Sequence, residues 1–173
     1  MTRSPLHTLD MAYIALFAVL TAVCAWISIP AGPIPFTLQT FAVLLALTTL
    51  GGRRGFYAVA VYLLLGAVGL PVFSGFQGGL GILLSAGGGF LLGFLPAALF
   101  YRLTETRLPP LAACLGALAV CYASGTVWYL LVYANSADVL TALRWCVLPF
   151  VLPDLLKLGL ALVVSRRLKS YLH

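Results

Sequence analysis

The sequence predicts an all-α, polytopic membrane protein with six transmembrane helices and both termini in the cytoplasm. Hydrophobic residues make up 62% of the 173-residue chain and charged residues only 8%, whereas soluble domains average about 25% charged residues. No charge occurs in residues 11–52, 55–101 or 108–137. Each of these runs can supply one or two spans of about 20 residues. We therefore expect a single integral membrane domain over residues 1–173.

The basic residues predict the orientation of this domain. Lys and Arg concentrate in the cytoplasmic loops of membrane proteins. Eight of the ten basic residues recur at intervals of a helix pair, Arg144 is expected on the opposite side and Lys157 within a span. This alternation fits an even number of spans. The eight residues are Arg3, Arg53, Arg54, Arg102, Arg107, Arg166, Arg167 and Lys169.

The first expected span covers residues 9–28 and carries Ala15, Ala18 and Ala22 at or near helical spacing. Small residues let another helix approach closely in a membrane. Two interpretations stay open for these alanines, packing within this protein and docking to a partner subunit.

The second span is expected at residues 36–50, after a loop on the outer side. Three prolines fall within residues 29–36, and proline removes amide donors and disfavours helix in the residue before it. Irregular backbone at membrane depth is tolerated only where it is buried in protein or lines a cavity. The polar residues that follow, Thr37, Gln39 and Thr40, therefore enter this span next to a structured outer loop.

The remaining spans are expected at residues 56–69, 87–102, 110–133 and 148–166. Outer connections are expected at residues 70–86, which are rich in glycine and contain Phe73 and Gln77, and at residues 134–146. Because the chain lacks the Gly-x-x-x-x-Gly-Lys-Ser/Thr motif of ATP-binding loops, any ATP-driven work needs another chain.

The most informative residues are Asp154 and Lys157, which lie inside an apolar segment of the last span. Ionisable groups within a membrane are expensive and usually functional. Residues three apart share one face of a helix, so the two side chains can neutralise each other in one cavity. Asp154 follows the start of the span by about six residues, or roughly 9 Å. The site is therefore expected in the outer part of the membrane.

This pair suits a small ligand with an apolar body and a planar polar head. Asp154 accepts hydrogen bonds from N–H groups and Lys157 donates to a carbonyl or carboxylate. A structural ion pair and a proton relay are the alternatives. Apolar walls are expected from Phe36, Phe73 and Phe90, and polar contacts from Thr37, Gln39 and Gln77.

Other functional classes find little support in the residues. The basic residues form no single patch for nucleic acid. The four cysteines have no Cys-x-x-Cys spacing, and they are best interpreted as buried apolar residues. The sequence shows no metal-ligand cluster and no nucleophile–base constellation, so we expect neither an enzyme, nor a metal site, nor a cofactor.

Four segments together resemble the BioY family, the biotin-specific S components of energy-coupling-factor (ECF) vitamin transporters. They are GPIPFTLQT (32–40), LLGAVGLPVF (64–73), GGFLLGF (88–94) and PDLLK (153–157). The resemblance implies a six-helix fold that binds biotin near the outer face, where Asp154 and Lys157 match the family's Asp-x-x-Lys pair. Where the family usually reads Gly-Pro-Thr-Gly-Gly-Tyr, this chain has Ser-Ala-Gly-Gly-Gly-Phe at 85–90.

The resemblance also implies partners and a location. An S component captures its vitamin outside and delivers it to the cytoplasm together with a transmembrane coupling subunit and two ATP-binding subunits, which hydrolyse the ATP. Ala15, Ala18 and Ala22 then match the docking surface for the coupling subunit. The implied location is the bacterial inner membrane, with multiple spans. An S component for another small vitamin and a non-transport structural subunit stay open as alternatives.

Overall fold

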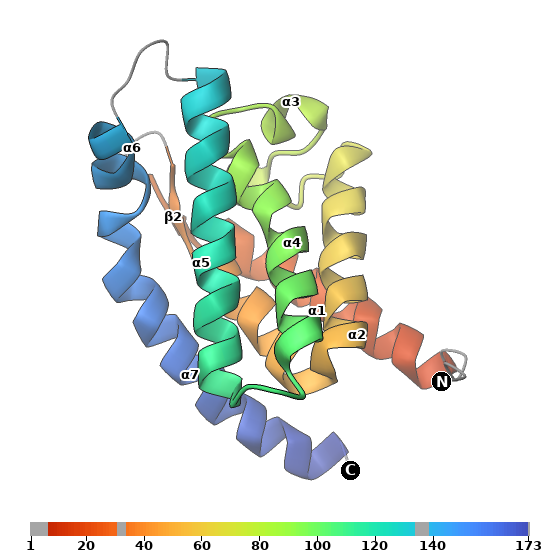
Figure 1. Cartoon of the computed structure of the whole chain (residues 1–173). Coiled ribbons are helices and arrows are strands. Elements are labelled where there is room, and N and C mark those ends of the chain that lie inside the picture. Colours follow the sequence, from red (N-terminus) through yellow and green to blue (C-terminus); the bar gives the residue numbers. More distant parts are fainter. Residues whose placement is uncertain (1–6, 31–33, 134–138, 173) are drawn as a thin grey trace.

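The computed structural model describes residues 7–30, 34–133 and 139–172, and helices make up most of it (Figure 1). A short antiparallel pair, β1 (Ser28–Ile29) and β2 (Phe36–Thr37), stands between the first two helices. The helices are α1 (Thr8–Trp26), α2 (Gln39–Ala67), α3 (Leu80–Leu83), α4 (Gly88–Thr104), α5 (Pro110–Trp128), α6 (Val139–Cys146) and α7 (Leu148–Leu172), with a π-helical turn (Tyr129–Tyr133) after α5 and a 3-10 turn at Ser74–Phe76.

Helix α2 contains both the second and the third expected span, because the chain reverses within it. Gly51 has φ 79° and ψ 166°, a conformation that glycine adopts without the penalty of a side chain. After the reversal Gly55 lies so close to Leu47 that a Cβ on Gly55 would be 2.8 Å from the Cα of Leu47. The two halves of α2 therefore form a tight hairpin, and the turn falls at the glycines before Arg53.

The prediction of an all-α fold with six membrane helices is confirmed. Three helices are long and apolar enough to cross a membrane, namely Thr8–Trp26, Pro110–Val132 and Leu148–Ser170, and Gly88–Thr104 is a shorter apolar helix. The two halves of α2 complete the set of six. In Figure 1 both chain ends and the turn from α4 to α5 lie at the lower end, which is the end predicted to face the cytoplasm, while α3 and α6 lie at the upper end.

Charged groups join the helices at this cytoplasmic end. Arg54 forms a 2.8 Å salt bridge with Asp10, whose other carboxylate oxygen accepts the backbone N–H of His7 at the start of α1. The carboxylate of Glu105 accepts the backbone N–H of Gly52 at 2.7 Å, and carboxylates are favourable at a helix N-terminus. The hairpin of α2 is thus held from α1 and from the end of α4.

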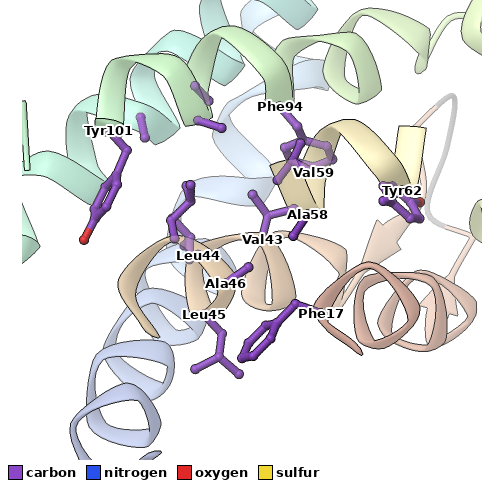
Figure 2. Packing of buried hydrophobic residues seen from close by; sticks show 14 of the residues in the cluster. Phe17, Val43, Leu44, Leu45, Ala46, Ala58, Val59, Tyr62, Phe94 and Tyr101 are labelled. Atoms are coloured by element: carbon purple, nitrogen blue, oxygen red, sulfur yellow. The ribbon is translucent and has the colours of Figure 1, made fainter. Parts of the chain in front are cut away.

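The first half of α2 is the centre of the core, since every residue from 42 to 50 is buried. A helix that is hydrophobic on all sides is buried among other elements. In agreement with this, α2 packs against α1, α4 and α7. Figure 2 shows Val43 and Leu44 of this half between Phe17 of α1 and Phe94 of α4.

The alanines of α1 lie on two different faces of the helix. Ala18 is 1% and Ala22 5% exposed, and both belong to the core. Ala15 is exposed, beside Leu16 and Val19. Residues four apart, such as Ala18 and Ala22, share one face, and here that face packs within this protein. Of the three alanines only Ala15 lies on the outer surface of α1.

Two of the expected outer connections are described in part. The structure describes residues 29, 30 and 34–36 of the proline-rich loop and residues 139–146 of the last connection. Residues 31–33 and 134–138, which also belong to these predictions, lie outside the described residues. Within the described part, α6 places Cys146 in the interior with no exposed surface, and burial raises the pKa of its thiol. The thiol of Cys146 is therefore protonated at neutral pH and suited to packing.

Candidate functional site

A cavity of about 580 Å³ lies at the outer end of the helices, within the size range of small-molecule sites. Its walls come from β1, β2, the start of α2, the 70–87 connection, α4, α5 and α7. Seven of the eight residues predicted for a binding site line it, and Phe36 is the exception. The polar side chains in the lining are Ser28, Thr37, Gln39, Thr40, Ser74, Gln77, Ser85, Tyr122, Asp154 and Lys157.

Asp154 and Lys157 form the expected ion pair in the wall contributed by α7. The Nζ atom of Lys157 lies 2.8 Å from Oδ1 of Asp154, and the carboxylate residue is 3% exposed. Buried charges are stable when their partners also satisfy their hydrogen bonds. The pair is formally neutral. Among the described residues that line the cavity, Asp154 and Lys157 are the two with charged side chains.

Tyr122 completes this group, and sequence reasoning missed it. Its hydroxyl donates a 2.6 Å hydrogen bond to Oδ2 of Asp154 from the neighbouring helix α5. Both carboxylate oxygens are therefore occupied, yet each has a further lone pair for a ligand donor. The available signal was general, namely that a buried carboxylate needs more than one hydrogen-bond donor, and it did not single out Tyr122 among the hydroxyl groups of the spans.

The beginning of α2 forms a second polar wall. Thr37, Gln39 and Thr40 line the cavity there, and Gln39 is 3% exposed. The hydroxyl oxygen of Thr37 accepts the backbone N–H of Gln39 at 3.3 Å, a local side-chain-to-backbone hydrogen bond just before the helix. The Nε2 atom of Gln39 is buried and has no partner among the described residues.

The segment from residue 70 to 79 covers part of the cavity and is anchored at two points. The ring of Phe73 fills the space over Gly66, where a Cβ would lie 2.0 Å from the ring, and it packs edge-on against Tyr62. Further out, Trp26 donates a 2.8 Å hydrogen bond to the carbonyl of Pro71 and stacks on Phe76. Phe73 is thus both a wall of the cavity and the anchor of its cover.

Gln77 lies in the same cover and lines the cavity. Its backbone carbonyl accepts the N–H of Phe73 at 2.9 Å, which closes the small loop between the two residues. The amide side chain of Gln77 is therefore held near the cavity by the fold of the segment itself.

Aromatic residues form the apolar walls. Phe90 of α4 packs directly over Gly125 of α5, where a Cβ would lie 2.4 Å from the ring. Phe36 takes a supporting position, because it stacks on Phe150 at a centroid distance of 4.3 Å and Phe150 lines the cavity in its place. Sequence reasoning did not select Phe150.

The departure at residues 85–90 begins at Ser85, whose hydroxyl and carbonyl groups both form hydrogen bonds within the protein. The hydroxyl of Ser85 donates to the carbonyl of Ile82 at 2.7 Å, and Trp128 donates to the carbonyl of Ser85 at 3.0 Å. Both Ser85 and Phe90 line the cavity. The charged groups of the site lie on α7, beside Tyr122 of α5.

The arrangement is suited to binding an uncharged polar head between donors and acceptors with an apolar body beside it. Within the described ranges no group of three or more His, Cys, Asp or Glu side chains is placed to hold a metal ion. The four cysteines are all buried.

The chain is similar to known proteins over almost its whole length. The family model described as the BioY family matches residues 1–173. The chain is 43% identical to the biotin transporter BioY of Thermotoga maritima, over 90% of this chain and 92% of that protein. It is 38% identical to the probable biotin transporter BioY of Pyrococcus horikoshii, over 93% of this chain and 96% of that protein.

A solved structure shares the fold. The crystal structure of the S component for biotin from an ECF-type ABC transporter superposes with a TM-score of 0.83 and covers 96% of this chain and 95% of that chain, at 24% sequence identity. The full-length family match and the two relatives agree with this fold. The chain therefore belongs to the BioY family.

Proposed function

We propose that this protein captures biotin at the outer side of the membrane and delivers it to the cytoplasm as the S component of an ECF-type ABC transporter. Its relatives in Thermotoga maritima and Pyrococcus horikoshii carry the names biotin transporter and probable biotin transporter. The observation that carries the proposal is the group of Asp154, Lys157 and Tyr122 in the wall of an outer cavity of about 580 Å³.

Biotin matches the chemistry of this cavity. Its ureido ring has two N–H donors and one carbonyl acceptor, which Asp154 and Lys157 can satisfy. The sulfur-containing ring that is fused to the ureido ring and the aliphatic chain are apolar, and we propose that they pack against Phe90 and Phe150. We propose Gln39, Thr37 and Gln77 as further polar contacts, with Phe73 as an apolar wall and Phe36 as support behind Phe150.

The proposed partners are a transmembrane coupling subunit and two ATP-binding subunits in the bacterial inner membrane. This chain has no ATP-binding loop motif, so the energy of transport is assigned to those subunits. It acts as a binding and transport subunit rather than an enzyme and needs no cofactor. Ala15 is the residue on α1 that we retain for the contact with the coupling subunit.

Titration of the purified protein in detergent tests the proposal. Biotin should bind tightly and in a one-to-one ratio, and Asp154→Asn should weaken binding by at least about a hundredfold, since a buried charge-assisted contact is lost. Asp10→Asn is the matched control, because Asp10 is also buried but lies at the cytoplasmic end. It should bind biotin like the unmodified protein. Absence of biotin binding, with tight binding of another vitamin in the same assay, would overturn the assignment of the ligand.

A further inference from the structure

One face of α7 is exposed along most of the helix. Leu152, Leu156 and Val163 are exposed on this face, and their separations of four and seven residues place them one above another. The opposite face, which includes Leu158 and Ala161, is buried in the core. Because α7 is long and apolar enough to cross a membrane, its exposed apolar face is suited to contact with the acyl chains of lipids.

The same face ends in basic residues. Arg166 and Arg167 follow Val163 by three and four residues and therefore continue its side of the helix. Lys169 lies beside them, and all three basic residues are exposed, while Leu168 packs against the core and holds this turn to the protein. Arg166 follows the first residue of α7 by about 18 residues, or roughly 27 Å, and the hydrocarbon core of a bilayer is about 30 Å thick. The three cations therefore reach the level of the lipid headgroups at the end predicted to face the cytoplasm.

The acidic residues described at this end are engaged elsewhere. They are Asp10, which pairs with Arg54, and Glu105, which accepts the backbone N–H of Gly52. Among the described residues the salt bridges involve Arg54 and Lys157, and neither of them includes the three cations at the end of α7. These cations therefore form a positive surface that is available to an anionic group from outside the protein.

We propose that the cytoplasmic end of α7 binds the headgroups of anionic phospholipids through Arg166, Arg167 and Lys169. Phosphate oxygens accept strong hydrogen bonds from guanidinium groups, and the inner leaflet of a membrane attracts basic residues next to a span. A phospholipid joins an anionic head to an apolar tail, in the order in which this face presents its basic and apolar residues. The contact with the coupling subunit is assigned to the other exposed helix face, at Ala15 of α1, which leaves the face of α7 to lipid.

Titration with two lipids that share their acyl chains and differ in the headgroup tests the proposal. Dioleoylphosphatidylglycerol, which is anionic, and dioleoylphosphatidylcholine, which is zwitterionic, are added separately to the purified full chain in detergent, and native mass spectrometry measures the bound lipid. Each basic residue near an anionic surface contributes about a fivefold gain in affinity. The unmodified protein should therefore prefer the anionic lipid by at least about tenfold. Replacing all three basic residues with Gln should remove most of this preference, and Arg166→Gln alone should reduce it by about fivefold.

Two control variants separate the place of the charge from the charge itself. Arg144→Gln removes an exposed cation from α6 at the outer end and should keep the preference for the anionic lipid. The double variant Arg166→Lys, Arg167→Lys retains both charges and should keep it as well. The thermal unfolding temperature in lipid-free detergent shows whether each variant is folded. In the unmodified protein the preference should also weaken as the salt concentration rises.

Equal binding of the two lipids by the unmodified protein would overturn the proposal, and so would a preference that the triple Gln variant retains. If that variant retains the preference but loses biotin uptake in cells that produce the complete transporter, the surface belongs to a partner protein instead of lipid. The lipid measurement does not depend on biotin. A protein that prefers the anionic lipid but binds no biotin would overturn the proposed function and leave this surface in place.

Discussion

The hydroxyl of Tyr122 in α5 donates a 2.6 Å hydrogen bond to Oδ2 of Asp154 in α7. Lys157 binds the other oxygen, Oδ1, at 2.8 Å. The carboxylate is thus fixed from two directions, and the two bonds offset the cost of burying it. The acceptor of the site is oriented before any ligand arrives, and preorganisation of this kind increases affinity.

Replacing Tyr122 with Phe tests this preorganisation. The ring remains while the hydroxyl is lost, so one oxygen of Asp154 loses its donor. We expect the ligand-free protein to lose about 1–2 kcal/mol of stability and biotin affinity to fall by about tenfold. Thermal unfolding in detergent and titration measure the two effects. Tyr57→Phe, near the cytoplasmic turn, is the control. Unchanged stability and affinity in Tyr122→Phe would show that the bond does not position Asp154.

The coupling between Asp154 and Lys157 can be measured with a double-mutant cycle. Lys157→Met leaves the buried carboxylate without its cation, a change that typically costs about 3–5 kcal/mol. The double variant Asp154→Asn, Lys157→Met removes both charges and should be more stable than Lys157→Met alone. Thermal unfolding of the ligand-free proteins gives the comparison. Additive losses would mean that the two charges do not stabilise each other.

The architecture and the ion pair could be predicted from the sequence because both depend on local rules. Uncharged runs of sufficient length predict spans, and basic residues predict the side of each turn, including the one at Arg53 and Arg54. The pairing of Asp154 with Lys157 follows from their separation of three residues in one helix. No knowledge of neighbouring helices is needed for these inferences.

Contacts between helices could not be predicted in the same way. Tyr122 reaches Asp154 only because α5 and α7 place their outer halves together, and the two residues are far apart in the sequence. Ala18 and Ala22 gave a correct signal of close helix packing, but their spacing does not say which helix packs there. The structure places them against the core, and Ala15 on the surface.

The cover of the cavity should weaken when its anchor is displaced. In Gly66→Ala the new Cβ would lie 2.0 Å from the ring of Phe73, so that the ring has to move. Overpacking of this kind costs about 1–3 kcal/mol. Since Phe73 anchors the 70–79 segment over the cavity, we expect biotin to dissociate roughly tenfold faster, as measured by competition with labelled biotin.

Gly159→Ala provides a matched control for this substitution. Gly159 is also in a helix, and no neighbouring atom lies within 4 Å of the position of its Cβ. It should leave biotin dissociation unchanged and stability unchanged or slightly higher. Equal dissociation rates in the two alanine variants would contradict a role of Phe73 as the anchor of the cover.

The two faces of α1 predict opposite outcomes for the same substitution. Ala18→Trp places a large ring in the core, where Ala18 is 1% exposed, and should reduce stability and biotin binding together.

Ala15→Trp changes only the outer surface, so the purified protein should bind biotin normally. If the coupling subunit docks on this face, Ala15→Trp should abolish biotin uptake by cells that produce the complete transporter. Leu160→Trp, on the exposed face of α7, should leave both binding and uptake intact. Normal uptake in Ala15→Trp would exclude this part of α1 from the contact with the coupling subunit.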